Sequence, residues 1–173
     1  MPCNKMKVVL YMAMSVNGYI AKSDNQTPWS TEEWHSFSAF VKEAGNIIVG
    51  RKTYEIMKAS DELPRLGNPF VVVISKDSFV HNDSVTLTHS PQSALQIIKN
   101  KKCTTALVAG GSTLNSSFLK DNLIDELILD LEPVLFGRGI PLFSYVHFTK
   151  KLELINTKKI SDHTIQLHYK IIN

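Results

Sequence analysis

Cysteine and long apolar runs are both scarce in this sequence, and their scarcity excludes several classes of protein. The 173 residues include two cysteines, and neither Cys3 nor Cys103 belongs to a C-x-x-C or similar spacing. We therefore expect no disulfide framework and no cysteine-bound metal. No apolar stretch approaches the roughly 18 residues that a membrane-spanning helix needs. The run from Val8 to Met14 lacks a small-residue cleavage site, so it predicts a strand and not a secretion signal. A cytoplasmic protein without a membrane partner is expected.

Charge is never concentrated in one part of the chain. The 19 basic and 16 acidic residues give a net charge of +3 and are interleaved, and the basic runs at 99–102 and 150–151 are short. A nucleic-acid surface normally shows a clustered basic face, so we expect small anionic ligands and no nucleic acid. The six histidines lack the spacing of metal ligands, which predicts no metal site.

Several catalytic motifs are missing as well. The sequence has no G-x-G-x-x-G after its first strand, no G-x-S-x-G and no G-x-x-x-x-G-K-[ST], which disfavours a Rossmann domain, the common hydrolases and nucleoside triphosphatases. No linker or repeat interrupts the chain, so we expect one domain over residues 1–173.

Strands and helices are expected to alternate along the chain. Apolar runs typical of buried strands lie at 7–14, 46–50, 70–74, 105–109 and 124–131, with a weaker strand at 84–88. Amphipathic segments predict helices at 31–44, 51–57, 91–100 and 112–119, the first capped by Ser30 or Thr31 and ended by Gly45. Alternation at 151–160 and 163–172 predicts a closing hairpin. The expected fold is a three-layer α/β/α structure with a mixed, mostly parallel central sheet and a C-terminal antiparallel hairpin.

Three of the predicted strands end in residues that suit an anion. A strand that stops at glycine and starts a helix presents free N–H groups and the positive end of the helix dipole. Such junctions lie at 50–53 and 110–113, and Ser75-Lys76 gives a third polar strand end. Because the carboxyl ends of parallel strands meet at one edge of a sheet, a dinucleotide with a pyrophosphate and a 2′-phosphate would use all three.

The order of these segments is similar to that of a known family. MSVNGYIA at 14–21, Pro28-Trp29, IIVGRKTYE at 47–55, LVAGGS at 107–112 and PVLFGRGIPLF at 133–143 resemble the dihydrofolate reductase fold. The resemblance is closest to the reductase domain of the bacterial riboflavin-biosynthesis deaminase-reductase and its stand-alone relatives. The zinc deaminase signature H-x-E with P-C-x-x-C is missing, so a reductase alone is expected.

This resemblance implies that NADPH binds along the strand ends. By position, the backbone of Ala13 and Ile20 would hold the nicotinamide carboxamide, and the Gly110–Gly111 peptide would be cis. The positive charges near the 2′-phosphate favour NADPH over NADH. The other residues implied in cofactor binding are Gly50, Arg51, Lys52, Thr53, Ser75, Lys76, Gly110, Gly111, Ser112 and Thr113.

Hydride transfer needs one proton donor besides the cofactor. Glu33 or Glu32 in the first helical turn is expected to supply the proton, with Asp24 as a weaker candidate, although acidic residues in a first turn also complement the helix dipole. Trp29 is expected to wall the pocket and Trp34 to pack in the core. The loop at 137–139 would either cover the substrate or lie on the surface.

Three hypotheses of function stay open. The first is an NADPH-dependent reductase of a 5-amino-6-(phosphoribosylamino)uracil-like compound, although no dedicated cluster for a substrate phosphate is identified. The second is a dihydrofolate or pterin reductase, and the third a non-catalytic nucleotide-binding relative. A homodimer is expected in each case, because the exposed C-terminal hairpin strand can pair with a second copy.

Overall fold

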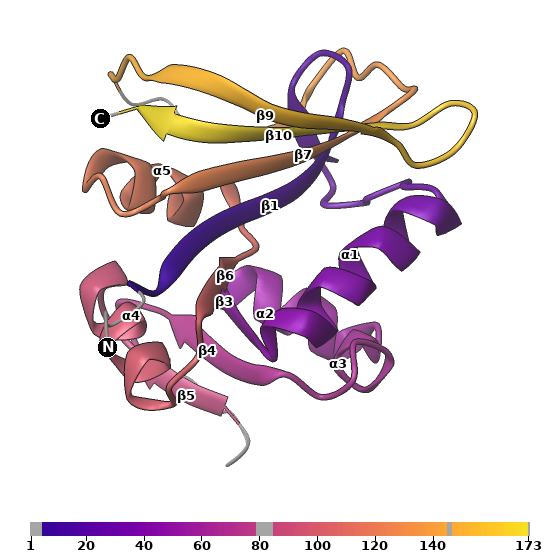
Figure 1. The fold of residues 1–173 in the computed structure, drawn as a ribbon. Helices are drawn as coiled ribbons and strands as arrows, with labels where there is room; N and C mark the ends of the chain where they lie inside the picture. Colours follow the sequence, from indigo (N-terminus) through magenta and orange to yellow (C-terminus); the bar gives the residue numbers. More distant parts are fainter. Residues whose placement is uncertain (1–4, 79–84, 145–146, 173) are drawn as a thin grey trace.

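An eight-stranded mixed sheet forms the centre of the molecule in the computed structural model, which describes residues 5–78, 85–144 and 147–172 (Figure 1). Cys3 and Ser84, the first residue of the predicted weak strand, lie outside these ranges. The strands follow the order β5-β4-β3-β6-β1-β7-β10-β9. Neighbours are parallel from β5 to β7, and β10 runs antiparallel to β7 and β9. Their bounds are β1 Lys7–Ser15, β3 Asn46–Gly50, β4 Phe70–Ile74, β5 Val85–Thr88, β6 Thr105–Val108, β7 Glu126–Glu132, β9 Lys151–Lys159 and β10 Ile165–Ile172.

Helices cover both faces of this sheet, which confirms the predicted three-layer architecture (Figure 1). One face is covered by α1 (Thr31–Ala44), α2 (Arg51–Ala59) and the short α3 (Glu62–Arg65). The other is covered by α4 (Pro91–Asn100) and α5 (Ser112–Lys120). No helix in the described ranges has both the length and the apolar character to cross a membrane.

The apolar strand runs of the sequence are explained by this two-sided covering. In β3, Ile47 and Val49 pack toward α1 and α2, whereas Ile48 between them packs toward the α4 and α5 side. Successive side chains of a strand point to opposite faces, so a strand covered on both sides is apolar at every position.

Local capping sets the bounds of α1. The Ser30 hydroxyl accepts a hydrogen bond from the Glu33 N–H (3.2 Å), and Gly45 takes a left-handed conformation (φ 67°) while donating to the Val41 carbonyl. These are the capping residues that the sequence predicts, with Ser30 the one of the two N-cap candidates that makes the bond.

Two small elements were not predicted. A second sheet pairs β2 (Tyr19–Lys22) with β8 (Gly139–Pro141) in antiparallel fashion. A Cβ at Gly139 would lie 2.6 Å from the Ala21 carbonyl oxygen, so only glycine permits this pairing. The third residue of the 137–139 loop is thus part of a strand, and α3 is the other unpredicted element.

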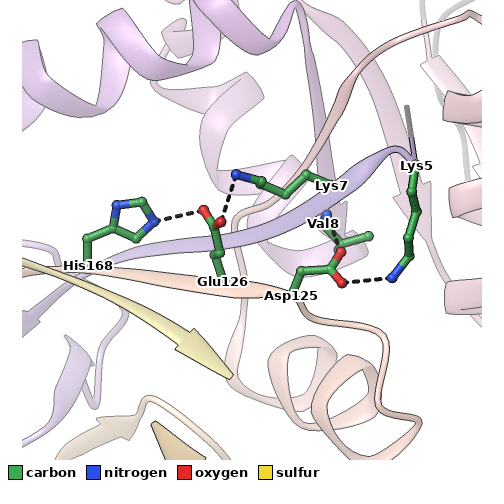
Figure 2. Close-up of polar contacts among 6 residues, drawn as sticks. All are labelled: Lys5, Lys7, Val8, Asp125, Glu126 and His168. Carbon is green, nitrogen blue, oxygen red and sulfur yellow. Dashed lines mark hydrogen bonds and ion pairs between the residues drawn. The ribbon is translucent and has the colours of Figure 1, made fainter. Parts of the chain in front are cut away.

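At the edge of the sheet opposite the strand carboxyl ends, polar contacts join β1, β7 and β10 (Figure 2). The Asp125 carboxylate accepts from the Val8 N–H (2.9 Å) and from the Lys5 ammonium (3.0 Å). The Glu126 carboxylate contacts the Lys7 ammonium at 2.7 Å and the His168 imidazole at 2.8 Å. These contacts fix the amino end of β1 against the start of β7.

Candidate active site

A cleft of about 900 Å³ opens where the strand carboxyl ends meet the first turns of α1, α2 and α5. Its floor is the junction of β3 and β6, where the Gly50 N–H donates to the Gly110 carbonyl (2.8 Å). The Gly110–Gly111 peptide is cis and Gly110 has φ +90°. A Cβ at Gly111 would lie 3.4 Å from the Thr53 hydroxyl, in ordinary van der Waals contact with it, and both residues line the cleft.

Two helices begin at this floor without a side-chain cap. Neither Gly50, before α2, nor Gly111, before α5, supplies a capping hydrogen bond. Uncapped first-turn N–H groups together with the helix dipole favour an anion. Ser112 lines the cleft and is 8% exposed, and its buried hydroxyl has no hydrogen-bond partner among the described residues. An unpaired buried hydroxyl costs free energy.

The ends of β4 and β5 supply a third polar patch. Ser75 and Lys76 follow β4 and line the cleft as expected. His89, which follows β5, lines it beside them with its ring Nδ1 2.8 Å from the Ser75 carbonyl oxygen. Because the carbonyl can only accept, Nδ1 carries the proton and Nε2 is left for other contacts. The sequence offered no signal for His89, since its role depends on the pairing of β4 with β5.

Glu33 is the acidic residue of α1 that the fold brings to the cleft. It is 5% exposed, it lines the cleft, and no described residue donates a hydrogen bond to its carboxyl group. Burial raises its pKa to about 8, helped by the negative charges of Asp130, Glu132 and Glu62. A glutamate with this pKa is protonated at neutral pH.

The alternative donors do not reach the cleft. Glu32 is exposed and does not line it, because adjacent residues of a helix point about 100° apart. Asp24 is also exposed and lies outside the cleft. Of the three predicted donors, Glu33 is therefore the one that lines the cleft.

A buried polar network lies behind Glu33. The Asp130 carboxylate, with no exposed surface, accepts from the Tyr11 hydroxyl (2.7 Å) and from the Gln166 amide (2.8 Å). The Gln166 amide also donates to the Tyr11 hydroxyl (2.9 Å). Burial raises the pKa of Asp130 to about 6, against the lowering effect of these two hydrogen bonds. Asp130 therefore stays largely ionised at neutral pH.

Glu132 is a second buried carboxylate of β7. It accepts from the Ser30 N–H and hydroxyl at 2.9 and 2.8 Å and from the Thr164 hydroxyl at 3.1 Å. Asp130 and Glu132 were not predicted as site residues. Two acidic residues at i and i+2 near the end of a largely apolar strand were the available signal, because both must face the same side of the sheet.

Aromatic side chains form the remaining wall. Trp29, Trp34 and Phe37 line the cleft. Trp29 stacks on Phe136 with ring centroids 5.9 Å apart. Trp34 packs against the core as expected but also faces the cleft, and the Arg65 guanidinium lies 4.6 Å from its ring centroid.

The structure brings most of the sequence-predicted residues to one place. Glu33 lines the cleft, and so do all the predicted cofactor-binding residues: Ala13, Ile20, Gly50, Arg51, Lys52, Thr53, Ser75, Lys76, Gly110, Gly111, Ser112 and Thr113. Arg51 lies at the mouth with its Nε 2.9 Å from the Glu55 carboxylate. The described residues contain no group of three or more histidine, cysteine, aspartate or glutamate side chains placed to hold a metal ion.

An eight-stranded sheet covered by helices on both faces, with a cleft at the carboxyl ends of its strands, defines a protein of the dihydrofolate reductase-like fold. The chain belongs to the family described as "RibD C-terminal domain", whose model matches residues 6–166. It is 33% identical over 169 residues to "Uncharacterized protein YwjB" of Bacillus subtilis (strain 168), covering 94% of this chain and 97% of that protein.

Two solved structures have a similar fold. A putative riboflavin biosynthesis protein from Shewanella sp. PV-4 superposes with a TM-score of 0.78 at 23% identity, over 97% of this chain and 100% of that chain. A Thermotoga maritima diaminohydroxyphosphoribosylaminopyrimidine deaminase/5-amino-6-(5-phosphoribosylamino)uracil reductase gives a TM-score of 0.73 at 19% identity. That match covers 97% of this chain and 57% of the longer one. The chain therefore shares the fold of these proteins.

Proposed function

We propose that this protein is an NADPH-dependent reductase of a small ribosylamino-pyrimidine compound. The observation that carries the proposal is the meeting, in one cleft, of two uncapped helix N-termini with a buried carboxyl group that no described residue hydrogen-bonds. Membership of the RibD C-terminal domain family supports an oxidoreductase. The proposed site of action is the cytoplasm.

The residues of the strand ends suit NADPH. The uncapped first turn of α5, which follows Gly111 and begins at Ser112, would accommodate the pyrophosphate. Arg51, Lys52 and Thr53 would lie along the phosphates at the start of α2. Ser75, Lys76 and His89 would surround the adenosine 2′-phosphate, with the backbone of Ala13 and Ile20 at the nicotinamide.

Glu33 would complete the reaction as the proton donor. When bound, NADPH would supply a hydride to the carbon of a C=O or C=N bond. Glu33 would give its proton to the oxygen or nitrogen of that bond, which yields an alcohol or an amine. The carboxylate left behind would take a proton back from water. The raised pKa of about 8 keeps Glu33 protonated for this step at neutral pH.

The first test is cofactor binding. Titration of the protein with NADPH and NADH, followed by cofactor fluorescence, should show saturable binding with NADPH preferred. Lys76→Glu should weaken NADPH binding about tenfold and NADH binding less, because the charge lies by the 2′-phosphate. Glu43→Lys, at an exposed position of α1 outside the cleft, is the control. If neither NADPH nor NADH binds, the proposal is wrong.

Glu33 also keeps pterin reduction open as a second function. Folate reductases carry an acidic residue on the helix after Pro-Trp, and Glu33 stands four residues after Trp29 and faces the cleft. NADPH oxidation measured with dihydrofolate, a pterin and a ribosylamino-pyrimidine separates the two. Turnover of the pyrimidine alone supports the first function, and turnover of the pterins alone supports the second.

A further inference from the structure

The two tryptophans of the chain both line the cleft but differ in what their rings contact. Trp34 packs against the core, and the Arg65 guanidinium lies over its ring. Trp29 belongs to neither of the two apolar core clusters among the described residues. It is half-buried and stands four residues before Glu33, directly before the N-cap of α1. Trp29 is therefore the tryptophan whose ring can offer a flat face to a ligand.

Phe136 supports the Trp29 ring from outside the cleft. The two rings stack with centroids 5.9 Å apart and an interplanar angle of 25°, an arrangement that stabilises aromatic pairs. Phe136 is buried and does not line the cleft, and the Tyr19 ring lies 6.4 Å from it, centroid to centroid. Residues 23–28, which lead to Trp29, form no helix or strand. The orientation of the Trp29 ring therefore depends on its stacking with Phe136.

Asn17 holds Phe136 in turn, although the two residues are 119 positions apart in the chain. The Asn17 amide donates to the Phe136 carbonyl (2.8 Å), and its side-chain oxygen accepts from the Phe136 N–H (3.3 Å) and from the Ser15 hydroxyl (2.9 Å). The buried Ser15 hydroxyl also accepts from the Tyr19 N–H (3.0 Å). These bonds join the turn after β1 to the loop after β7. Asn17 does not line the cleft, so it can act on a ligand only through the residues that it holds.

We propose that the heterocycle of the substrate stacks on the cleft side of the Trp29 ring, and that Asn17 is the positioning residue that holds this ring in place through Phe136. This inference rests on the proposed function, because it takes the cleft to bind a planar ring beside the cofactor. Stacking on an aromatic side chain sets the plane of a ring and leaves its polar edge for hydrogen bonds. A ring stacked on Trp29 therefore keeps its edge for the carboxyl group of Glu33.

A ring variant tests the stacking surface. The protein saturated with NADP⁺ is titrated calorimetrically with 5-amino-6-(5-phosphoribosylamino)uracil as the probe. Trp29→Leu should weaken binding of the probe about tenfold, the size expected for one lost stacking contact, and should change the NADPH affinity less than about twofold. Phe148→Leu, at an exposed aromatic position outside the cleft, is the matched control. Equal probe affinity in Trp29→Leu and wild type, or no binding of the probe to wild type, would overturn the proposal.

A double-mutant cycle tests whether Asn17 acts through Trp29. Asn17→Ala should weaken binding of the probe about fivefold in the wild-type protein and have no further effect in Trp29→Leu, because the ring that Asn17 positions is then absent. Phe136→Leu, which keeps the apolar volume but removes the stacked ring, should follow the same pattern with Asn17 intact. Equal losses in both backgrounds would mean that Asn17 supports the fold in general, and would overturn its assignment.

Fluorine NMR of protein labelled with 5-fluorotryptophan reads the ring directly, because the chain has two tryptophans. The probe should move the Trp29 signal more than the Trp34 signal, and Asn17→Ala should move the Trp29 signal and leave the Trp34 signal in place. A probe that moves only the Trp34 signal would contradict the proposed surface. Titration of the same preparations with NADPH keeps the two proposals apart. Loss of NADPH binding overturns both, whereas NADPH binding with a Trp29 signal that the probe does not move overturns only the stacking surface.

Discussion

At the scale of single residues, Glu33 combines burial with the absence of a described hydrogen-bond donor to its carboxyl group. Such a group is stable only when it is protonated or when a ligand completes its contacts. With a pKa of about 8, the turnover rate should be constant below that pH and fall tenfold for each unit above it. Glu33→Gln should lower the turnover number at least about a hundredfold with little change in NADPH affinity. A pH–rate profile and a cofactor titration measure both.

A variant of Asp130 tests why the pKa of Glu33 is raised. Its negative charge is one of the causes of the raised pKa of Glu33, so Asp130→Asn should lower that pKa and move the fall in rate toward neutral pH by about one unit. Asp162→Asn, in the exposed hairpin turn, should leave the profile in place. A profile that stays unchanged in Asp130→Asn would mean that the charge of Asp130 does not reach the reacting group.

At the scale of elements, the Glu126 contacts with Lys7 and His168 tie β7 to β1 and β10 (Figure 2). Burial alone would raise the pKa of Glu126, but the hydrogen bonds from Lys7 and His168 outweigh it and lower the pKa overall. A lowered carboxyl pKa means that the native state favours the ionised form. Its contribution to stability is therefore present above the ordinary pKa of glutamate and is lost as the pH falls through the lowered value.

Glu126→Gln should accordingly lower the free energy of unfolding by about 0.5–1 kcal/mol at pH 7, the size expected for partly exposed ion pairs. The difference from wild type should shrink as the pH falls below the ordinary range of a glutamate. Urea denaturation at pH 7 and in acid measures it, with Glu43→Gln on the exposed side of α1 as the control. A difference that is equally large in acid would assign the effect to packing instead of charge.

At the scale of the whole molecule, the hairpin of β9 and β10 leaves apolar surface uncovered. Every residue of β9 is exposed, and the exposed apolar side chains of the hairpin include Leu152, Leu154, Ile155 and Ile165. β9 is also the edge strand of the sheet, and no strand among the described residues pairs with its outer side. We propose that a second copy of the chain covers this edge.

Light scattering of the purified protein should therefore give twice the monomer mass. Leu154→Glu should shift the mass toward that of the monomer, because it places a charge in the apolar contact. Ala39→Glu, on the exposed side of α1, should leave the mass unchanged. A monomeric wild-type protein at micromolar concentration would contradict the proposed dimer.

Much of the fold was predictable because its signals are local. Each apolar run, in β3, β4 and β6, consists of consecutive residues, and each cap of α1 lies next to the helix end that it closes. The local pattern alone therefore indicates these structures. The short α3 and the β2–β8 pair were missed because four- and three-residue elements have too little periodicity. Both depend on contacts with distant segments instead of on their own sequence.

The residues of the candidate site also fall into those that local sequence predicts and those that it does not. The glycine and hydroxyl residues at the strand ends follow from the junction of a strand with a helix, so they were predictable residue by residue. The choice of Glu33 over Glu32 was not, because it depends on which side of α1 faces the cleft. His89, Arg65 and Asp130 were missed because each acts through a residue far away in the chain, namely the Ser75 carbonyl, the Trp34 ring and the Glu33 carboxyl.

The three-layer fold and the strand-end residues suited to a phosphate-rich ligand follow from the order of the residues, since both arise from short-range patterns of apolar, glycine and hydroxyl residues. Which acid is buried in the cleft, and which charges surround it, depends on the packing of segments far apart in the chain. Electrostatic interaction depends on distance through space and on burial. The carboxylates of β7 come close to the residues of α1 and α3, and become buried, only when the sheet and its helices pack together.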